Sequence, residues 1–113
     1  MLKEQSFETG AVTINYAEGP PSGQPLVLLH GGGDRLQHFL PIIPDLVLRW
    51  HVFALDLRGH GKSGRVPNEY RPEHYVADIL AFLERQCTER VVLFGHSLGG
   101  WIALLATAQR MGK

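Results

Sequence analysis

Apolar and polar residues follow different periods along the 113-residue chain, and each period predicts a type of element. Between residues 6 and 18, two short strand-like pieces flank a turn. In the second piece, Val12, Ile14 and Tyr16 alternate with polar residues. This alternation predicts a half-exposed strand at an antiparallel edge of a sheet.

Three continuous apolar runs follow, at residues 26–29, 52–55 and 91–94. Strands that are apolar at every position suit a sheet covered on both faces, as parallel sheets are. Apolar residues at helical spacing predict helices over about residues 39–49, 72–87 and 101–110. Pro41 and Pro44 leave the start of the first helix open. In the second helix, Val76, Ile79 and Leu83 share an apolar stripe and Asp78 lies off it.

The order of these elements predicts an α/β fold, with a mainly parallel sheet, an antiparallel first hairpin and flanking helices. The loops richest in glycine each follow a predicted strand. They should therefore gather at the carboxyl edge of the sheet, where α/β proteins place their sites.

Composition narrows the class of protein. Eleven basic and eleven acidic residues give a formal net charge of zero, and no basic stripe indicates nucleic-acid binding. The length allows at most one domain. A single cysteine, Cys87, rules out a disulfide framework and fits a reducing compartment. Without an apolar run of membrane-spanning length or a signal-peptide pattern, we expect a cytoplasmic protein that needs no membrane.

The strongest chemical signal is Gly95-x-Ser97-x-Gly99, between the last predicted strand and the last predicted helix. This context predicts a nucleophile elbow, in which Ser97 occupies a strained backbone conformation. Gly95 and Gly99 would be required because side chains there would collide with nearby backbone. The N–H of Leu98 would then point out from a helix start, where negative charge is favoured. The alternative is a glycine-rich turn in which Ser97 only caps the helix.

A second glycine-rich loop follows the first apolar run, at His30-Gly31-Gly32. Glycines let backbone N–H groups approach a substrate oxygen, so this loop is a candidate half of an oxyanion hole. We expect the N–H of Gly32 to pair with that of Leu98, although Gly33 and Asp34 remain alternatives. A flexible turn without a function is the other interpretation.

A third loop, residues 59–64, matches G-x-G-x-x-G but does not open a helix directly, as a dinucleotide site requires. A phosphate-binding loop would need glycine where the chain has Asp56. We therefore predict a shaped loop under the site, held by hydrogen bonds and charge from Asp56 and Arg58. No cofactor is expected.

The histidines predict neither a metal site nor a catalytic base. No histidine pair has the spacing of metal ligands with a matching carboxylate. His96 adjoins Ser97 but should point away from it across the turn. His60 follows a strand expected beyond the one that ends at His30, and His30 is expected to brace its own loop.

The residues at 26–32, 56–63 and 95–100 together resemble the α/β-hydrolase fold family, in family order and spacing. The resemblance implies that residues 1–113 form a single incomplete domain, the amino-terminal half of the family fold. It favours the serine branch of esterases, carbon–carbon bond hydrolases, lactonases and haloperoxidase-like enzymes. Dehalogenases and epoxide hydrolases of the same branch carry aspartate where this chain has Ser97.

The family order is nucleophile, acid, histidine, which implies that the acid and the histidine lie beyond Lys113. The implied reaction is acyl transfer on a small ester or related carbonyl substrate, through an acyl-enzyme on Ser97. In the family sheet the elbow strand is internal, so residues 91–94 would here be an open apolar edge. Such an edge could pair with a complementing chain or with a second copy. The alternative function is an inactive remnant or interaction module that uses this edge.

Overall fold

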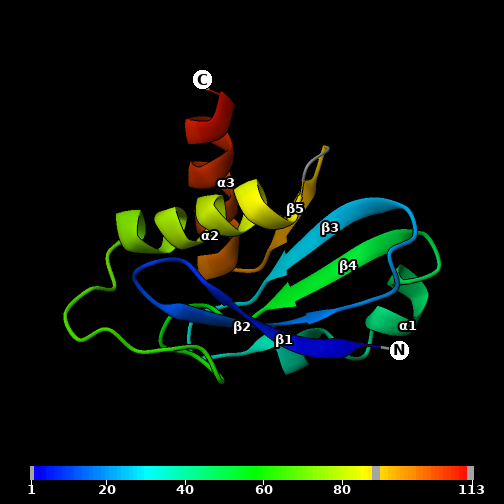
Figure 1. The fold of residues 1–113 in the computed structure, drawn as a ribbon, viewed down its shortest axis with the longest axis horizontal. Helices are drawn as coiled ribbons and strands as arrows, with labels where there is room; N and C mark the ends of the chain where they lie inside the picture. The colour runs from blue at the N-terminus through cyan, green and yellow to red at the C-terminus, as the bar shows by residue number, and fades with distance from the viewer. Residues whose placement is uncertain (1, 88–89, 112–113) are drawn as a thin grey trace.

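The computed structural model of the protein describes residues 2–87 and 90–111. The strands are β1 (Lys3–Glu8), β2 (Thr13–Glu18), β3 (Gln24–Leu29), β4 (Trp50–Leu55) and β5 (Val92–Gly95). The helices are α1 (Ile43–Leu46), α2 (Pro72–Gln86) and α3 (Leu98–Met111), and a 3₁₀ helix, η1, covers Leu36–Phe39. The order confirms the predicted α/β plan (Figure 1).

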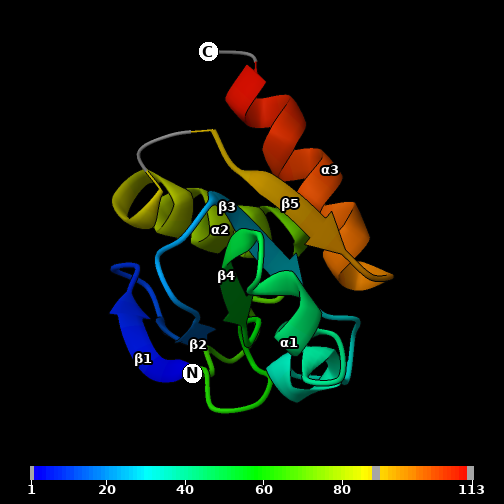
Figure 2. The ribbon, with the colours of Figure 1, turned by 90° about the vertical axis from the view of Figure 1, so that its right-hand side faces the viewer.

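The five strands form one sheet in the order β1-β2-β4-β3-β5. β2 pairs antiparallel with both β1 and β4, and β3 pairs parallel with both β4 and β5. β3 is therefore the central parallel strand, and the loops after β3, β4 and β5 meet at one edge of the sheet. β5 has one strand partner and forms an edge of the sheet (Figure 2).

Each face of the parallel strands has its own core. On β3, Val27 and Leu29 pack in a cluster with residues of α2 and α3. Leu26 and Leu28 pack on the other face with residues of η1 and α1. The views in Figures 1 and 2 agree that α2 and α3 lie together and that α1 lies apart from them. The continuous apolar runs are explained by this double cover.

The predicted helix over residues 39–49 was wrong. The segment instead contains η1, then the four-residue α1, with Leu40 and Ile42 each 45% exposed between them. Pro44 falls in the first turn of α1. A proline in a helix interior removes an N–H donor and clashes with the preceding turn, so two prolines three residues apart break the segment into short pieces.

The predicted edge position of residues 12–16 was also wrong. β2 lies between β1 and β4, and β1 is the edge strand. Asn15 is only 9% exposed because its side chain donates to the buried Asp56 Oδ2 at 3.0 Å. A polar residue in a period-two pattern thus faces a buried carboxylate here and not solvent.

Candidate active site

The turn between β5 and α3 has the geometry of a nucleophile elbow. Ser97 is exposed and has a φ of 56°, a left-handed conformation that is uncommon for a residue with a side chain. A hydrogen bond from His96 N to Leu29 O, 3.0 Å, ties the turn to the end of β3. A second, from Gly99 N to His96 O at 3.0 Å, closes it. The strain falls on the one residue whose side chain stands at the apex.

Neighbouring backbone occupies the space that a side chain would need at each of the two elbow glycines. A methyl group on Gly95 would lie 2.2 Å from Gly99 O, and one on Gly99 would lie 2.1 Å from Leu29 O. Real Cβ atoms do not approach backbone this closely, so only glycine allows α3 to start directly over β5 and β3. This is the close approach that the motif predicts.

The loop after β3 lies directly against the elbow. A methyl group on Gly31 would lie 3.4 Å from Ser97 Cβ, and one on Gly32 would lie 3.7 Å from Leu98 Cδ2. Gly33 N donates to His60 Nε2 at 2.9 Å, and Asp34 N donates to Gly31 O at 3.1 Å.

The two expected N–H groups remain free to donate. In the described part of the chain, neither the N–H of Gly32 nor that of Leu98 forms a hydrogen bond, whereas those of Gly33 and Asp34 are both used. Of the three candidate donors in this loop, Gly32, Gly33 and Asp34, only Gly32 therefore has an available N–H beside the elbow.

His30 is buried and braces its own loop, as expected. Its Nδ1 lies 2.7 Å from Gly31 O, and its Nε2 accepts the N–H of Leu57 at 2.9 Å. Burial lowers the pKa of His30, and the hydrogen bond to the Gly31 carbonyl opposes this shift. With both nitrogens engaged by backbone, His30 has none left for the Ser97 hydroxyl.

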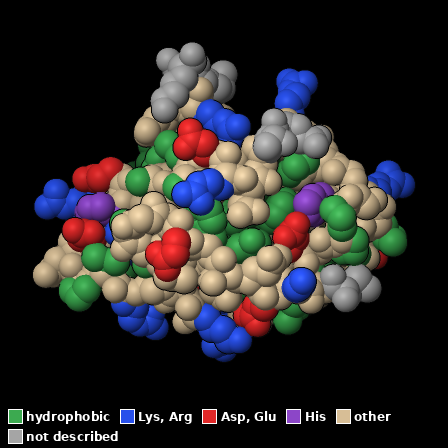
Figure 3. All heavy atoms as spheres, viewed as in Figure 1, with side chains coloured by type: hydrophobic (Ala, Val, Ile, Leu, Met, Phe, Trp, Pro, Cys, Tyr) green, Lys and Arg blue, Asp and Glu red, His purple; other side chains and the backbone are tan. Residues whose placement is uncertain are grey.

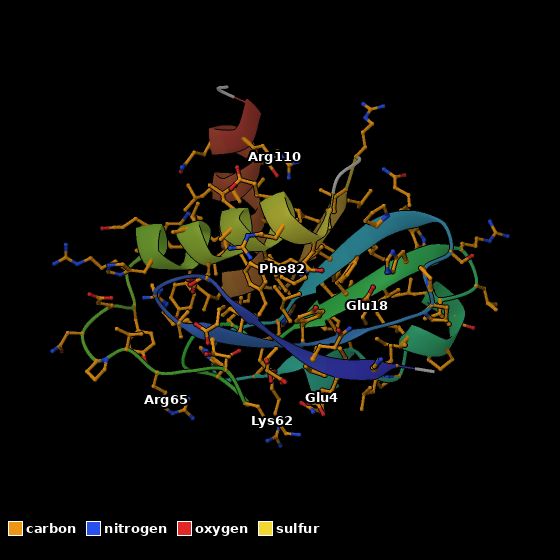
Figure 4. The ribbon with its side chains drawn as sticks, in the orientation of Figure 1. Glu4, Glu18, Lys62, Arg65, Phe82 and Arg110 are labelled. Atoms are coloured by element: carbon orange, nitrogen blue, oxygen red, sulfur yellow. The ribbon has the colours of Figure 1, made fainter. Side chains whose placement is uncertain are left out.

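Asp56 is a buried hub under the site. Its Oδ1 accepts the N–H of Leu36 at 2.8 Å, and its Oδ2 accepts the N–H of Lys62 and the Asn15 side chain, each at 3.0 Å. The carboxylate therefore joins the loop after β3, the loop after β4 and strand β2. Lys62 itself extends outward to Glu4 on β1, with Nζ and Oε1 3.2 Å apart (Figure 4).

Arg58 anchors the same loop to α2. The side chain is 2% exposed, and its Nε and Nη2 donate to Asp78 at 2.9 and 2.8 Å in a bidentate pair. Nη1 donates to Glu69 O at 2.9 Å. Burial raises the pKa of Asp78, and the hydrogen bonds from Arg58 oppose that rise. These contacts are of the kind predicted for Asp56 and Arg58, hydrogen bonds and charge that hold the loop after β4.

Sequence reasoning missed two contributors. Asp78, placed on the polar side of its helix, is 3% exposed and partners Arg58. The only signal was an arginine after a buried strand with no assigned counter-charge. The ring of His38 stacks on that of His96 beside the elbow, with centroids 5.4 Å apart, and its Nδ1 lies 2.9 Å from Asp34 Oδ2. The spacing of His38 from Asp34, one helical turn, was the available clue.

Other kinds of site have little support among residues 2–87 and 90–111. No cluster of three or more histidine, cysteine, aspartate or glutamate side chains there has the arrangement of a metal site. None of the helices in this part of the chain has the length and apolarity needed to cross a membrane. On the face in Figure 3, acidic and basic side chains are interspersed.

A family model described as alpha/beta hydrolase fold matches residues 24–111. The chain belongs to the α/β hydrolase fold family. The match begins at β3 and includes the two loops under the site, the elbow and α3.

Relatives within this family differ in their named chemistry. The chain is 36% identical over 92 residues to a serine hydrolase-like protein of Danio rerio, covering 80% of this chain and 28% of that protein. It is also 36% identical over 101 residues to the dihydrolipoyllysine-residue acetyltransferase component of the acetoin cleaving system of Pseudomonas putida, covering 88% of this chain and 27% of that protein. The chain thus spans less than a third of both relatives.

A solved structure extends the same picture to three dimensions. The crystal structure of E-2-(acetamidomethylene)succinate hydrolase matches with a TM-score of 0.88 and 28% sequence identity. The match covers 96% of this chain and 40% of that one. The fold of this α/β hydrolase chain is therefore similar to part of a larger hydrolase.

Proposed function

We propose that the α/β hydrolase chain supplies the nucleophile and oxyanion hole of a serine hydrolase that acts on a small ester or related carbonyl substrate. The observation that carries the proposal is the exposed, strained Ser97, beside which the N–H groups of Gly32 and Leu98 are free. A serine that only capped a helix would need neither the strain nor a second donor loop against it. The names of the Danio rerio relative and of the crystallised succinate hydrolase also support hydrolysis.

The reaction we propose is acyl transfer in two steps. Ser97 Oγ attacks the carbonyl carbon while its proton passes to a base, and the carbonyl electron pair moves onto oxygen. The N–H groups of Gly32 and Leu98 donate to that oxygen, and losing one such donor typically costs about 3–4 kcal/mol. Collapse of the intermediate expels the leaving group with the proton, and water then releases the acyl group from Ser97.

The base is proposed to come from a part of the full family domain outside residues 1–113. His30 has both ring nitrogens engaged by backbone, and His60 does too. A catalytic histidine needs one nitrogen for the serine and one for the acid that orients it. We propose that the reaction needs no cofactor, since backbone donors can stabilise the charge that develops in it. We also propose the reducing cytoplasm as the compartment.

The test is labelling by a fluorophosphonate probe together with hydrolysis of p-nitrophenyl acetate, in the natural full-length protein. We expect Ser97→Ala to abolish both, because no other oxygen replaces the nucleophile. Ser22→Ala is the matched control, since Ser22 is also exposed in a glycine-containing loop but follows β2 at the other end of the sheet. Equal hydrolysis by Ser97→Ala and the unaltered protein would exclude Ser97 as the nucleophile.

The second candidate function is binding of a polypeptide through β5, and one observation favours it. β5 pairs only with β3 in the described sheet, and its Val92 and Phe94 are 37% and 50% exposed. An open apolar strand binds other strands through its unpaired backbone groups. We propose that the binding partner is a polypeptide carrying further strands of the same family domain. In the crystal structure of E-2-(acetamidomethylene)succinate hydrolase, the part that matches this chain lies within a chain more than twice as long.

Mixing the 113-residue chain with a fragment of the same full-length protein that starts after residue 113 tests this second function. We expect a one-to-one complex and recovered probe labelling at Ser97. Formation of homodimers alone, in the presence of the fragment, would assign the edge to a second copy instead.

A further inference from the structure

We propose that His60 is a positioning residue that fixes the loop after β3 so that Gly32, and not Gly33, presents a free N–H to the elbow. Gly33 and His60 are 27 residues apart in the sequence, and one of the contacts between their two loops is the hydrogen bond that Gly33 N donates to His60 Nε2 at 2.9 Å. The catalytic consequence of this contact rests on the proposed function, whereas the contact itself does not.

The hydrogen bonds of His60 define its tautomer. Its Nδ1 lies 2.9 Å from Arg58 O, which can only accept, so Nδ1 carries the proton. Nε2 receives the Gly33 N–H and therefore carries none. His60 must be neutral, with one nitrogen donating and the other accepting, for both contacts to exist.

The ring has a firm support on the side away from the site. The Arg58 carbonyl that accepts from His60 belongs to the residue whose side chain is held by Asp78 of α2. His60 therefore connects Gly33, through Arg58, to the loop after β4 and to α2. Because Gly33 has a φ of 79°, its orientation is one that the chain would readily lose without an external partner.

Asp56 holds the other end of the same loop, through the N–H of Leu36 at 2.8 Å. Between these anchors, Asp34 N donates back to Gly31 O. Of the three candidate donors Gly32, Gly33 and Asp34, only the N–H of Gly32 is left without a hydrogen bond among the described residues. Without the hydrogen bond from Gly33 to His60, the Gly32–Gly33 peptide could rotate. Gly32 would then no longer be the residue that is fixed with a free N–H towards the elbow.

Protonation of His60 would break its hydrogen bond with Gly33. A proton on Nε2 would replace the acceptor by a donor and set two N–H groups against each other. The ring of His60 faces that of His30, with the centroids 5.1 Å apart, and Arg58 lies on the same loop as His60. The carboxylates of Asp34 and Asp56 act electrostatically on His30. His30 cannot take over the contact, since its Nε2 already accepts from Leu57. We infer that acid weakens the hold on Gly33.

The structural test uses NMR on the ¹⁵N-labelled full-length protein and needs no activity. Long-range ¹⁵N–¹H spectra at pH 8 should find the Nδ1–H tautomer at His60, and the Gly33 amide should shift together with the His60 ring signals when acid is added. In His60→Gln, whose side-chain carbonyl can accept the same N–H without titrating, that dependence should disappear. An Nε2–H tautomer, or a Gly33 shift that ignores the His60 titration in the unaltered chain, would overturn the proposal.

His74 provides a matched control. Its Nδ1 also accepts a backbone N–H, that of Arg71 at 3.1 Å, but at the start of α2. His74→Gln should therefore leave the Gly33 titration unchanged. Variants are compared only where the amide of Val27, in the middle of β3, keeps its position in the spectrum. If His74→Gln removes the Gly33 titration as His60→Gln does, the assignment to His60 is wrong.

The catalytic arm uses kcat and KM of the full-length protein. His60→Leu removes the acceptor at every pH and should lower kcat with little change in KM, by at most the roughly hundred- to thousandfold loss that follows removal of an oxyanion donor. His60→Gln should keep the rate at high pH and lose less of it in acid. A normal rate in His60→Leu would reject the positioning role, and hydrolysis that survives Ser97→Ala would reject the proposed function while leaving the NMR result to stand alone.

Discussion

At the scale of single residues, the elbow depends on two hydrogen atoms where other residues have a Cβ. Gly95→Ala and Gly99→Ala would each place a methyl group about 2 Å from a backbone carbonyl oxygen. Because backbone cannot yield as a side-chain end can, we expect each to lower the free energy of unfolding by about 3 kcal/mol or more. Urea denaturation measures this loss.

Gly32→Ala is the control for both variants, since its methyl group would meet Leu98 Cδ2 at an ordinary 3.7 Å. It should change the free energy of unfolding by less than about 1 kcal/mol. A Gly99→Ala chain as stable as Gly32→Ala would mean that the turn is not as closely packed as described.

The buried His30 makes stability depend on pH. Burial places its pKa in the folded chain below the ordinary value of 6.5, so the unfolded chain binds more protons in that interval. The stability contributed by neutral His30 is complete above pH 6.5 and is lost as the pH falls from there towards the lower folded value. We expect the urea midpoint to fall between pH 7.5 and 5.5, and to fall less in His30→Gln. A pH dependence identical in the two chains would contradict this assignment.

At the scale of elements, a buried ion pair between Arg58 and Asp78 links the loop after β4 to α2. Removing a single partner of a buried pair leaves an uncompensated charge and typically costs about 3–5 kcal/mol. We therefore expect Asp78→Asn to be strongly destabilising in urea denaturation, because Arg58 is 2% exposed and cannot reach water.

Glu69→Gln is the matched control for that variant. Glu69 Oε1 lies 3.7 Å from Nη1 of the same guanidinium, but its side chain is 50% exposed. Exposed ion pairs contribute about 0–1 kcal/mol, so little change is expected. If both variants cost the same, burial does not set the energy of this pair.

The elements that the sequence predicted well are those whose apolar residues alone set the pattern, at every position in a strand covered on both faces and along one stripe in a helix. The apolar runs that became β3 and β4 and the stripe that became α2 needed no tertiary information. Residues 39–49 failed because prolines outweighed the spacing of apolar residues. Asn15 and Asp78 failed because each polar side chain is buried against one charged partner, Asp56 or Arg58, that is distant in sequence. The spacing of apolar residues in the sequence indicates which positions are buried by apolar groups. It does not indicate which polar side chains are buried against a charged partner.

At the scale of the whole molecule, the site could be predicted only in part. Ser97, the glycines and the loop after β3 are local features of motifs, and their contacts follow from the sheet order. That Gly33 is occupied by His60, and Gly32 is not, depends on how two loops meet in space. An acid and a histidine are expected from the family order alone, so their positions stay a prediction.

The open edge of the sheet should govern how the 113-residue chain behaves in solution. Val92 and Phe94 are exposed on β5, and Trp101 and Leu104 are 59% and 73% exposed on α3. A continuous apolar strand with unpaired backbone groups promotes association, and a lysine on such a strand opposes it. We therefore expect light scattering to find dimers or larger species whose share rises with concentration, and Phe94→Lys to shift the chain towards the monomer. Leu48→Lys is the control, because Leu48 is 76% exposed but lies beyond α1 and not on the edge strand. If Leu48→Lys dissociates the chain as well as Phe94→Lys does, association arises from general surface apolarity and not from β5.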